Sequence, residues 1–257
     1  MKKTIIDISP VEFPEAIRYL FKDATVYDSS CSPDASVYYL DNGYYIKTAP
    51  LNSLFGEAKL ASLFAAKGLG VEVIAYISSG KDYLITRSAE GEDLTHHLED
   101  PKKLCALLAS ALRRLHSMPT EGAPLSATFQ QYMDSANGSP SGGSYDASVL
   151  MDPYRVASKE EAWAIMQANK HRLTPSTLIH GDPCLPNIIQ KNGIFSSFID
   201  CNMAGVGDKH TDLYWAIWSL QYNLKTNAYT NLFLDLYGRE NFEEDMLPVI
   251  AAFESFG

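Results

Sequence analysis

Three oxygen-bearing side chains lie close together in this sequence. They occur in His180-Gly181-Asp182-Pro183-Cys184-Leu185-Pro186-Asn187 and in the Phe198-Ile199-Asp200 that follows. The order is an acid, an amide five residues later, and a second acid thirteen residues after the amide. Phosphoryl transfer requires such a set, because one carboxylate must orient the acceptor hydroxyl while Asn and Asp oxygens hold the magnesium ions that bridge the ATP phosphates.

A turn signal between these motifs predicts that they meet in space. Asn192-Gly193 tolerates the positive φ angles of a tight turn, so residues 187–199 are predicted to form a β-hairpin. We therefore interpret Asp182 as the catalytic base and Asn187 and Asp200 as magnesium ligands. Taken singly, each could instead be a polar loop residue that bonds to nearby backbone amides.

A lysine in the first third of the chain is a candidate for binding phosphate. Lys47 ends the apolar segment Tyr44-Tyr45-Ile46-Lys47, and Glu57 on the next predicted helix is its natural anionic partner. Asp41, Glu72 and Asp82 compete for that role. The alternative is a lysine that keeps an edge strand soluble.

The segment from Ser30 to Ser36 is rich in small polar residues, which let backbone amides approach phosphates. It lacks both glycine-rich phosphate-binding patterns, so by itself it also fits an ordinary turn.

The elements around these residues predict an α+β fold with two parts. The first ninety residues contain a hairpin signal at Asp41-Asn42-Gly43, a helix over 57–67, and strands over 71–77 and 82–86. From Pro101 the pattern is helical, and a loop rich in turn formers, which we expect to be mobile, interrupts it at 135–148. The helices are predicted over 101–118, 158–171, 210–224, 228–237 and 243–255. We therefore predict a nucleotide-binding lobe over 1–90 and a catalytic and substrate-binding lobe over 91–257.

Composition restricts the partners. The chain has 21 Lys and Arg against 31 Asp and Glu, a formal charge of −10. This balance argues against nucleic acid and suits a cationic small molecule, although acidity for solubility alone is equally compatible. The four cysteines are scattered, which favours reduced thiols over disulfides or a zinc site. Without a signal peptide or membrane-spanning segment, a cytoplasmic location is expected. The oligomeric state is left open, with a monomer as the expectation.

These residues together resemble the aminoglycoside phosphotransferases, and within them the 3′-phosphotransferase branch. The likeness is most specific at His-Gly-Asp-Pro-Cys-Leu-Pro-Asn over 180–187, at Phe-Ile-Asp over 198–200 and at Gly-Asp-Lys-His-Thr-Asp-Leu over 207–213. The Asp-x4-Asn spacing also equals that of the protein-kinase catalytic loop, although the flanking residues differ. Supporting matches occur at 31–38, 45–47, 57–60, 112–116 and 253–256.

The resemblance implies a protein-kinase-like two-lobed fold with a small antiparallel sheet and one helix in the N-terminal lobe, and a larger, mainly helical C-terminal lobe. It implies ATP and Mg²⁺ as cofactors, with GTP in place of ATP left open. It assigns Asp182 to catalysis and Asn187 and Asp200 to the metal. The residues that it assigns to the nucleotide are Lys47, Glu57, Ser32, Tyr45, Arg87 and Ala89. We expect Asp212 to bond to the catalytic loop, and His116 and His180 to be structural.

Three positions depart from the family pattern, all in regions that shape its antibiotic site. Asn202-Met203 stands where the family has Gly-Arg, and Trp218 stands where it has a second arginine. The family's C-terminal Asp-Glu-x-Phe is here Phe253-Glu254-Ser255-Phe256. Glu254 is therefore the main candidate to bind a cationic substrate, with Asp152 and Glu160 as further candidates, and each could equally be a solvated surface charge.

The sequence thus predicts a kinase that transfers the γ-phosphoryl group of ATP to a hydroxyl of a small cationic molecule, most naturally an aminoglycoside antibiotic, which would make it a resistance enzyme. One rival is a kinase of the same fold that acts on another antibiotic, a sugar or an amino alcohol. The other rival is a kinase-like binding module without turnover.

Overall fold

The computed structural model describes residues 3–31, 33–139 and 144–256. The chain divides into two compact units, Met1–Glu90 and Gly91–Gly257, and each is described by itself. The nucleotide-binding and catalytic roles that the sequence suggests for the two units remain predictions.

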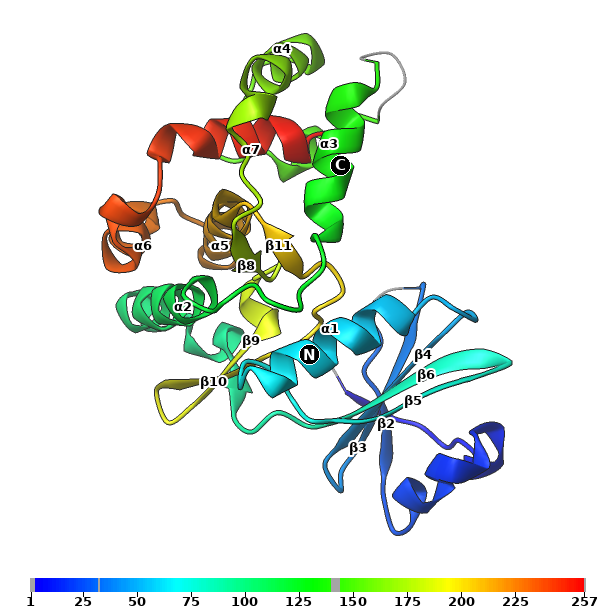
Figure 1. Cartoon of the computed structure of the whole chain (residues 1–257). Helices are drawn as coiled ribbons and strands as arrows, with labels where there is room; N and C mark the ends of the chain where they lie inside the picture. Colours follow the sequence, from blue (N-terminus) through cyan, green and yellow to red (C-terminus); the bar gives the residue numbers. More distant parts are fainter. Residues whose placement is uncertain (1–2, 32, 140–143, 257) are drawn as a thin grey trace. The chain divides into compact units, whose positions relative to one another are not determined.

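The N-terminal unit is an antiparallel sheet with one α-helix (Figure 1). The strand order is β1-β2-β3-β4-β6-β5. The strands are β1 (Thr4–Ile5), β2 (Val26–Asp28), β3 (Ser36–Leu40), β4 (Tyr44–Ala49), β5 (Val73–Ser79) and β6 (Lys81–Arg87), and the helix is α1 (Phe55–Ala66). The hairpin at Asn42-Gly43 and the helix are confirmed. Short 3-10 helices at Pro10–Glu12 and Glu15–Phe21 precede β2 and were not predicted.

Alternation along β4 separates its core residues from its candidate site residues. Ile46 is fully buried in a cluster with Leu40 and Ile85 on one face of the sheet. Because successive side chains of a strand point to opposite faces, Tyr45 and Lys47 lie on the other face. Lys47 is paired in register with Leu84, which belongs to a second buried cluster that includes Ala58 of α1.

A buried carboxylate fixes the start of α1. Asp82 on β6 accepts hydrogen bonds from the N–H of Leu54 (2.9 Å), the Tyr76 hydroxyl (2.9 Å) and the Ser78 hydroxyl (2.7 Å). Burial opposes its charge, but these bonds and one from the Asn52 backbone outweigh burial and lower the pKa of Asp82. Asp82 therefore ties the helix that carries Glu57 to the sheet that carries Lys47.

The C-terminal unit is mainly helical. Its helices are α2 (Pro101–His116), α3 (Ala127–Asn137), α4 (Lys159–Asn169), α5 (Lys209–Leu224), α6 (Thr230–Tyr237) and α7 (Leu247–Glu254). Its strands are β7 (Glu92–Asp93), β8 (Thr177–Ile179), β9 (Ile188–Lys191), β10 (Ile194–Phe198) and β11 (Gly205–Gly207), in the orders β10-β9-β7 and β11-β8. The five predicted helices are present, whereas α3 was missed and includes the first residues of the expected 135–148 loop. Residues 140–143 of that loop lie outside the described residues.

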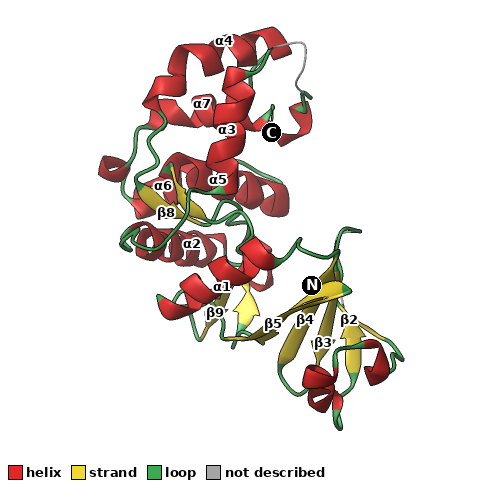
Figure 2. Cartoon of the chain, turned by 45° about the vertical axis from the view of Figure 1, so that its right-hand side comes forward, coloured by secondary structure: helices red, strands yellow, loops and turns green. Residues whose placement is uncertain are grey.

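Helix α7 is the centre of the helical packing. It contacts α3, α4 and α5, which surround it in Figure 2. Six of its eight residues are buried, so the end of α7 is held firmly among three other helices. None of the helices in the described ranges combines the length and hydropathy that crossing a bilayer would need.

Removing the Asp82 carboxylate should destabilise the N-terminal unit. Asp82→Ala leaves buried donors without an acceptor, and we expect a loss of roughly 2–4 kcal/mol in the free energy of unfolding. Urea denaturation measures this loss, with the exposed Asp7→Ala as control. A change equal to that of the control would contradict the anchoring role of Asp82.

Candidate active site

The predicted β9–β10 hairpin places the two candidate metal ligands at its open end. Phe198 pairs with Ile188, and the next residue, Ile199, donates its N–H to the Asn187 carbonyl (3.0 Å). Asp200 follows directly, with a left-handed φ of 58° that turns the chain away from the strand. The backbone pairing therefore brings Asn187 and Asp200 to the same end of the hairpin.

The Asn187 side chain holds the candidate base. Its Nδ2 donates to the backbone carbonyl of Asp182 and to Oδ2 of the Asp182 carboxylate, both at 3.0 Å. Because both amide hydrogens serve Asp182, the amide oxygen of Asn187 is directed away from that residue. Asp182 itself is half-buried and Asn187 is buried. The Asp-x4-Asn spacing thus closes a loop in which the amide orients the acid.

Asp212 on α5 anchors the backbone of the same loop. Its carboxylate has no exposed surface and accepts the backbone N–H groups of His180 and Gly181, both at 2.8 Å. It also accepts from His116 Nε2 at 3.0 Å. The expected structural bond from Asp212 to the catalytic loop is confirmed. At the start of α5, Asp208 caps the helix by accepting the N–H of His210.

His180 links the loop to the hairpin. Its Nε2 lies 3.0 Å from the Ile199 carbonyl, and its Nδ1 lies 3.3 Å from the Asp182 N–H. Since a carbonyl only accepts and an N–H only donates, the arrangement fits a neutral ring protonated on Nε2. His180 is fully buried and is structural, as expected.

Gly181 occupies a position that no other residue fits. Its φ is +83°, and an added Cβ would lie 2.5 Å from the Met203 carbonyl oxygen. Met203, one of the departures from the family pattern, therefore contributes its backbone to the wall of the catalytic loop.

The opposite end of the loop is fixed by Ser219 on α5. The Ser219 hydroxyl accepts the N–H of Leu185 (2.9 Å), and Asn223 donates to the Ser219 carbonyl (2.8 Å). Burial, together with the nearby charge of Asp182, raises the pKa of the Cys184 thiol. The thiol therefore stays protonated at neutral pH and can donate to the Asp182 carboxylate.

Glu254 is half-buried near the candidate base. At the end of α7, its Oε1 accepts the Tyr132 hydroxyl of α3 and the indole N–H of Trp215 on α5, the latter at 2.6 Å. Burial raises the pKa of Glu254 to about 7, with a contribution from the negative charge of Asp182, although the two hydrogen bonds oppose the shift. Glu254 is therefore close enough to Asp182 for their charges to interact.

The two other candidate substrate acids are at the surface. Asp152 is exposed and pairs with Arg155 at 3.0 Å. Glu160 is exposed in the first turn of α4, where bonds from its own backbone N–H and from Ser158 lower its pKa. No contact found in the described ranges joins either residue to Glu254 or Asp182.

In the N-terminal unit the expected ion pair is present. Lys47 Nζ lies 2.9 Å from Oε1 and 2.8 Å from Oε2 of Glu57. The Lys47 side chain is 22% exposed and that of Glu57 is 8% exposed, so the pair is largely shielded from solvent. Among the competing acids, Asp82 is engaged at the start of α1 and Glu72 pairs with Arg87.

The other candidate nucleotide-binding residues differ in what they offer. Tyr45 is half-buried, and its ring lies 4.9 Å from that of Tyr39. The backbone N–H of Arg87 donates to the Glu72 carbonyl, so it is not free for a base. No acceptor for the Ala89 N–H is found within the described parts of the chain, which makes Ala89 the better donor. Ser32 lies outside the described residues.

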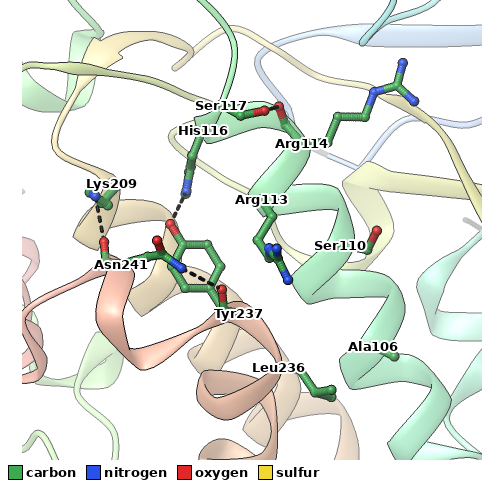
Figure 3. A pocket seen from close by; sticks show the side chains of 10 residues that line it. All are labelled: Ala106, Ser110, Arg113, Arg114, His116, Ser117, Lys209, Leu236, Tyr237 and Asn241. Carbon is green, nitrogen blue, oxygen red and sulfur yellow. Dashed lines mark hydrogen bonds between the residues drawn. The ribbon is translucent and has the colours of Figure 1, made fainter.

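A cavity of about 840 Å³ lies within the C-terminal unit (Figure 3). Its lining includes Arg113, His116, Lys209 and Tyr237 and excludes Asp182, Asn187, Asp200 and Glu254. In Figure 3 His116 bonds to Tyr237 and Lys209 bonds to Asn241, so two of its polar groups are already engaged within the protein. We therefore place the candidate active site at the catalytic loop and not in this cavity.

Known proteins match most of this chain. The model of the phosphotransferase enzyme family matches residues 33–247. A probable aminoglycoside 3′-phosphotransferase of Lactococcus lactis is 39% identical over 253 residues, which are 96% of this chain and 95% of that protein. The chain belongs to the phosphotransferase enzyme family. The resemblance stated from the sequence is confirmed.

This phosphotransferase has further relatives and structural neighbours. An aminoglycoside 3′-phosphotransferase of Niallia circulans is 29% identical over 69% of this chain and 68% of that protein. The crystal structure of a type VIII aminoglycoside 3′-phosphotransferase superposes with a TM-score of 0.69 at 22% identity, over 95% of this chain and 98% of that one. The predicted kinase-like fold is thereby confirmed.

Several groups of this phosphotransferase's site were missed from the sequence. Trp215 and Ser219 follow Asp212 at intervals of three and seven residues, a spacing that places all three on one face of α5. That periodicity could have identified them. Tyr132 lies on the unpredicted α3, and no sequence signal connects it to Glu254.

Asp212 should control both stability and activity. In Asp212→Asn one oxygen is replaced by an amide that faces backbone donors, so we expect a loss of roughly 2–4 kcal/mol in the free energy of unfolding. Displacement of the loop should lower kcat by about a hundredfold. Urea denaturation and steady-state kinetics check both, with Asp7→Asn as control. Unchanged kcat in a folded variant would argue against a positioning role for Asp212.

Glu254 should lower stability at high pH. Its pKa of about 7 in the folded protein exceeds that of an unfolded glutamate, about 4.3. The folded state therefore binds more protons between these values, and stability falls as pH rises through the window. Glu254→Gln cannot ionise, so we expect it to gain roughly 1–3 kcal/mol on wild type between about pH 5.5 and about pH 8. Thermal or urea unfolding at both values measures the change. A pH-independent difference in stability between Glu254→Gln and wild type, like that expected of the exposed Glu121→Gln control, would count against a raised pKa of Glu254.

Proposed function

We propose that this phosphotransferase transfers the γ-phosphoryl group of ATP to a hydroxyl of an aminoglycoside. The observation that carries the proposal is the Asp182–Asn187 bond at the open end of the β9–β10 hairpin, with Asp212 holding the backbone beneath it. Relatives named as aminoglycoside 3′-phosphotransferases along nearly the whole chain support the choice of acceptor.

Asp182 acts on the acceptor. Its carboxylate accepts a hydrogen bond from the acceptor hydroxyl and takes its proton as the new O–P bond forms. The bond between the γ-phosphorus and the bridging oxygen breaks, and ADP leaves with the electron pair. Asn187 keeps one carboxylate oxygen of Asp182 occupied, which fixes the direction of the other.

The donor set fits Mg²⁺. This hard cation prefers oxygen ligands and is usually held by one or two carboxylates together with substrate phosphates. Asp200 provides a carboxylate, and the Asn187 amide oxygen is directed away from Asp182 because both hydrogens of the amide are engaged there. These two residues would hold the metal, which supplies charge neutralisation for the phosphates.

The N-terminal unit offers nucleotide contacts of its own. Lys47, oriented by Glu57, would neutralise phosphate charge. Tyr45 lies on the same face of the sheet as Lys47 and offers a ring to the base, while Ala89 offers an N–H for which the described residues provide no acceptor. Solved neighbours contain ADP with streptomycin or AMP-PNP with hygromycin B, at 20% and 16% identity, so they support the nucleotide by fold alone.

Glu254 would bind an ammonium group of the acceptor. The charge of Glu254 interacts with that of Asp182, so the two carboxylates lie near each other. An acceptor whose hydroxyl binds Asp182 and whose ammonium group binds Glu254 therefore carries these two groups close together. The exposed Asp152 and Glu160 have no such coupling, and we leave them out of the proposed site.

An acceptor panel tests the proposal. ADP release is measured with kanamycin, neomycin, streptomycin, choline and simple sugars as acceptors, in wild type, Asp182→Asn and Asp200→Ala. We expect turnover with at least one aminoglycoside and its loss in both variants, with magnesium-dependent nucleotide binding also lost in Asp200→Ala. Turnover with choline or sugars alone would refute the acceptor class. No turnover with any acceptor would refute the enzyme activity itself.

A further inference from the structure

Two residues outside the catalytic loop act on Glu254. We propose that Tyr132 and Trp215 are positioning residues, which donate to one oxygen of Glu254 and thereby turn its other oxygen toward the ammonium group of the acceptor. This inference rests on the proposed function, because it assumes that Glu254 binds a cationic acceptor.

The geometry of the two bonds carries the inference. The Tyr132 hydroxyl and the Trp215 indole N–H approach from different helices, α3 and α5, and both donate to Oε1. Within the described ranges, no protein hydrogen bond is found to Oε2. A carboxylate has two oxygens that can accept, so this arrangement saturates one of them and leaves the other for a ligand.

Neither donor is free to turn away. Tyr132 is 1% exposed, and its ring packs against Phe253, the residue before Glu254, at 5.1 Å. The Trp215 ring meets Tyr214 and Trp218 edge-on at 6.2 and 5.5 Å. Packing therefore fixes both donors, so the two side chains that bond to Glu254 are rigid aromatic groups.

In the described part of the chain no cation is found among the groups that shift the pKa of Glu254, and Lys159 of the neighbouring α4 lies over the Phe256 ring at 5.8 Å. The titratable groups that face it are Tyr132 of α3, Tyr214 of α5, and Asp182 and Cys184 of the catalytic loop. None of these four side chains carries a positive charge in either of its protonation states. Burial raises the pKa of Tyr132 above its ordinary value, so its hydroxyl remains a donor. The two hydrogen bonds are thus the protein's own support for the ionised Glu254.

A purely structural role for the two bonds makes a different prediction. If they only tied three helices together, their loss would lower stability without affecting how acceptor binding depends on pH. If they position and ionise Glu254, their loss raises the pKa of the carboxylate, because both bonds favour the charged form. Acceptor affinity at neutral pH then falls, while ATP binding and the chemical step are unaffected.

The experiment compares Trp215→Phe and Tyr132→Phe with wild type. Acceptor KM, ATP KM and kcat are measured from about pH 6 to about pH 9 with the best aminoglycoside of the panel. We expect the acceptor KM to rise about tenfold at neutral pH, because each variant loses one hydrogen bond to a charged group. The ratio of mutant to wild-type acceptor KM should decrease toward high pH, where Glu254 is ionised in both proteins.

Trp163→Phe is the matched control, since Trp163 of α4 packs against Phe256 at 5.6 Å and donates no bond to Glu254. A pH-independent KM ratio, or equal losses in acceptor KM and kcat, would overturn the positioning role. Thermal unfolding shows which variants are folded, and each donor is tested by its own variant. Absence of turnover in wild type would refute the proposed function and the inference together. Active wild type with Trp215→Phe and Tyr132→Phe behaving like Trp163→Phe would refute the inference alone.

Discussion

The Asp212 carboxylate is the point on which the catalytic loop depends. It accepts two consecutive backbone N–H groups, from His180 and Gly181, and a bond from His116 in a region without solvent. Buried donors need acceptors, so the loop cannot leave this carboxylate without leaving several groups unsatisfied. Gly181 is part of the same constraint, because only glycine permits the close approach of Met203 at a φ of +83°. Asp182 therefore follows a backbone segment that is constrained by these bonds and by the close approach at Gly181.

The Glu254 carboxylate differs from that of Asp212 in how its oxygens are hydrogen-bonded. Asp212 accepts hydrogen bonds on both of its oxygens, whereas Glu254 receives two donors on one oxygen and has a pKa of about 7. An acid that is under-compensated in the free protein gains most when a cation arrives. The cost of partly burying Glu254 in the absence of ligand would thus be the physical basis for the affinity for a cationic acceptor that we propose, a trade of stability for function that is common in binding sites.

Local signals explain which parts of this structure the sequence could predict. The Asn192-Gly193 turn determined the hairpin, and the hairpin determined that Asn187 and Asp200 share one end, because both relations involve neighbouring residues. The Lys47–Glu57 pair was also accessible, since a strand and the helix that follows it are close in the chain. Glu254 was expected as a substrate acid, but its burial and its bonds to Tyr132 and Trp215 depend on the packing of α3, α5 and α7. Such contacts join residues 39 and 122 positions apart, and no local pattern encodes them.

The catalytic loop and the surroundings of Glu254 are held by different kinds of contact. The catalytic loop is held mainly through backbone N–H groups, which every sequence provides, together with a few acceptors such as Asp212 and Ser219. The wall around Glu254 is instead built from side chains, including Trp215 and, in contact with it, Trp218. Changing a side chain of this wall alters the chemistry offered to the acceptor without disturbing the backbone bonds that hold Asp182. The geometry of phosphoryl transfer can therefore remain constant in this fold while the acceptor site is rebuilt around it.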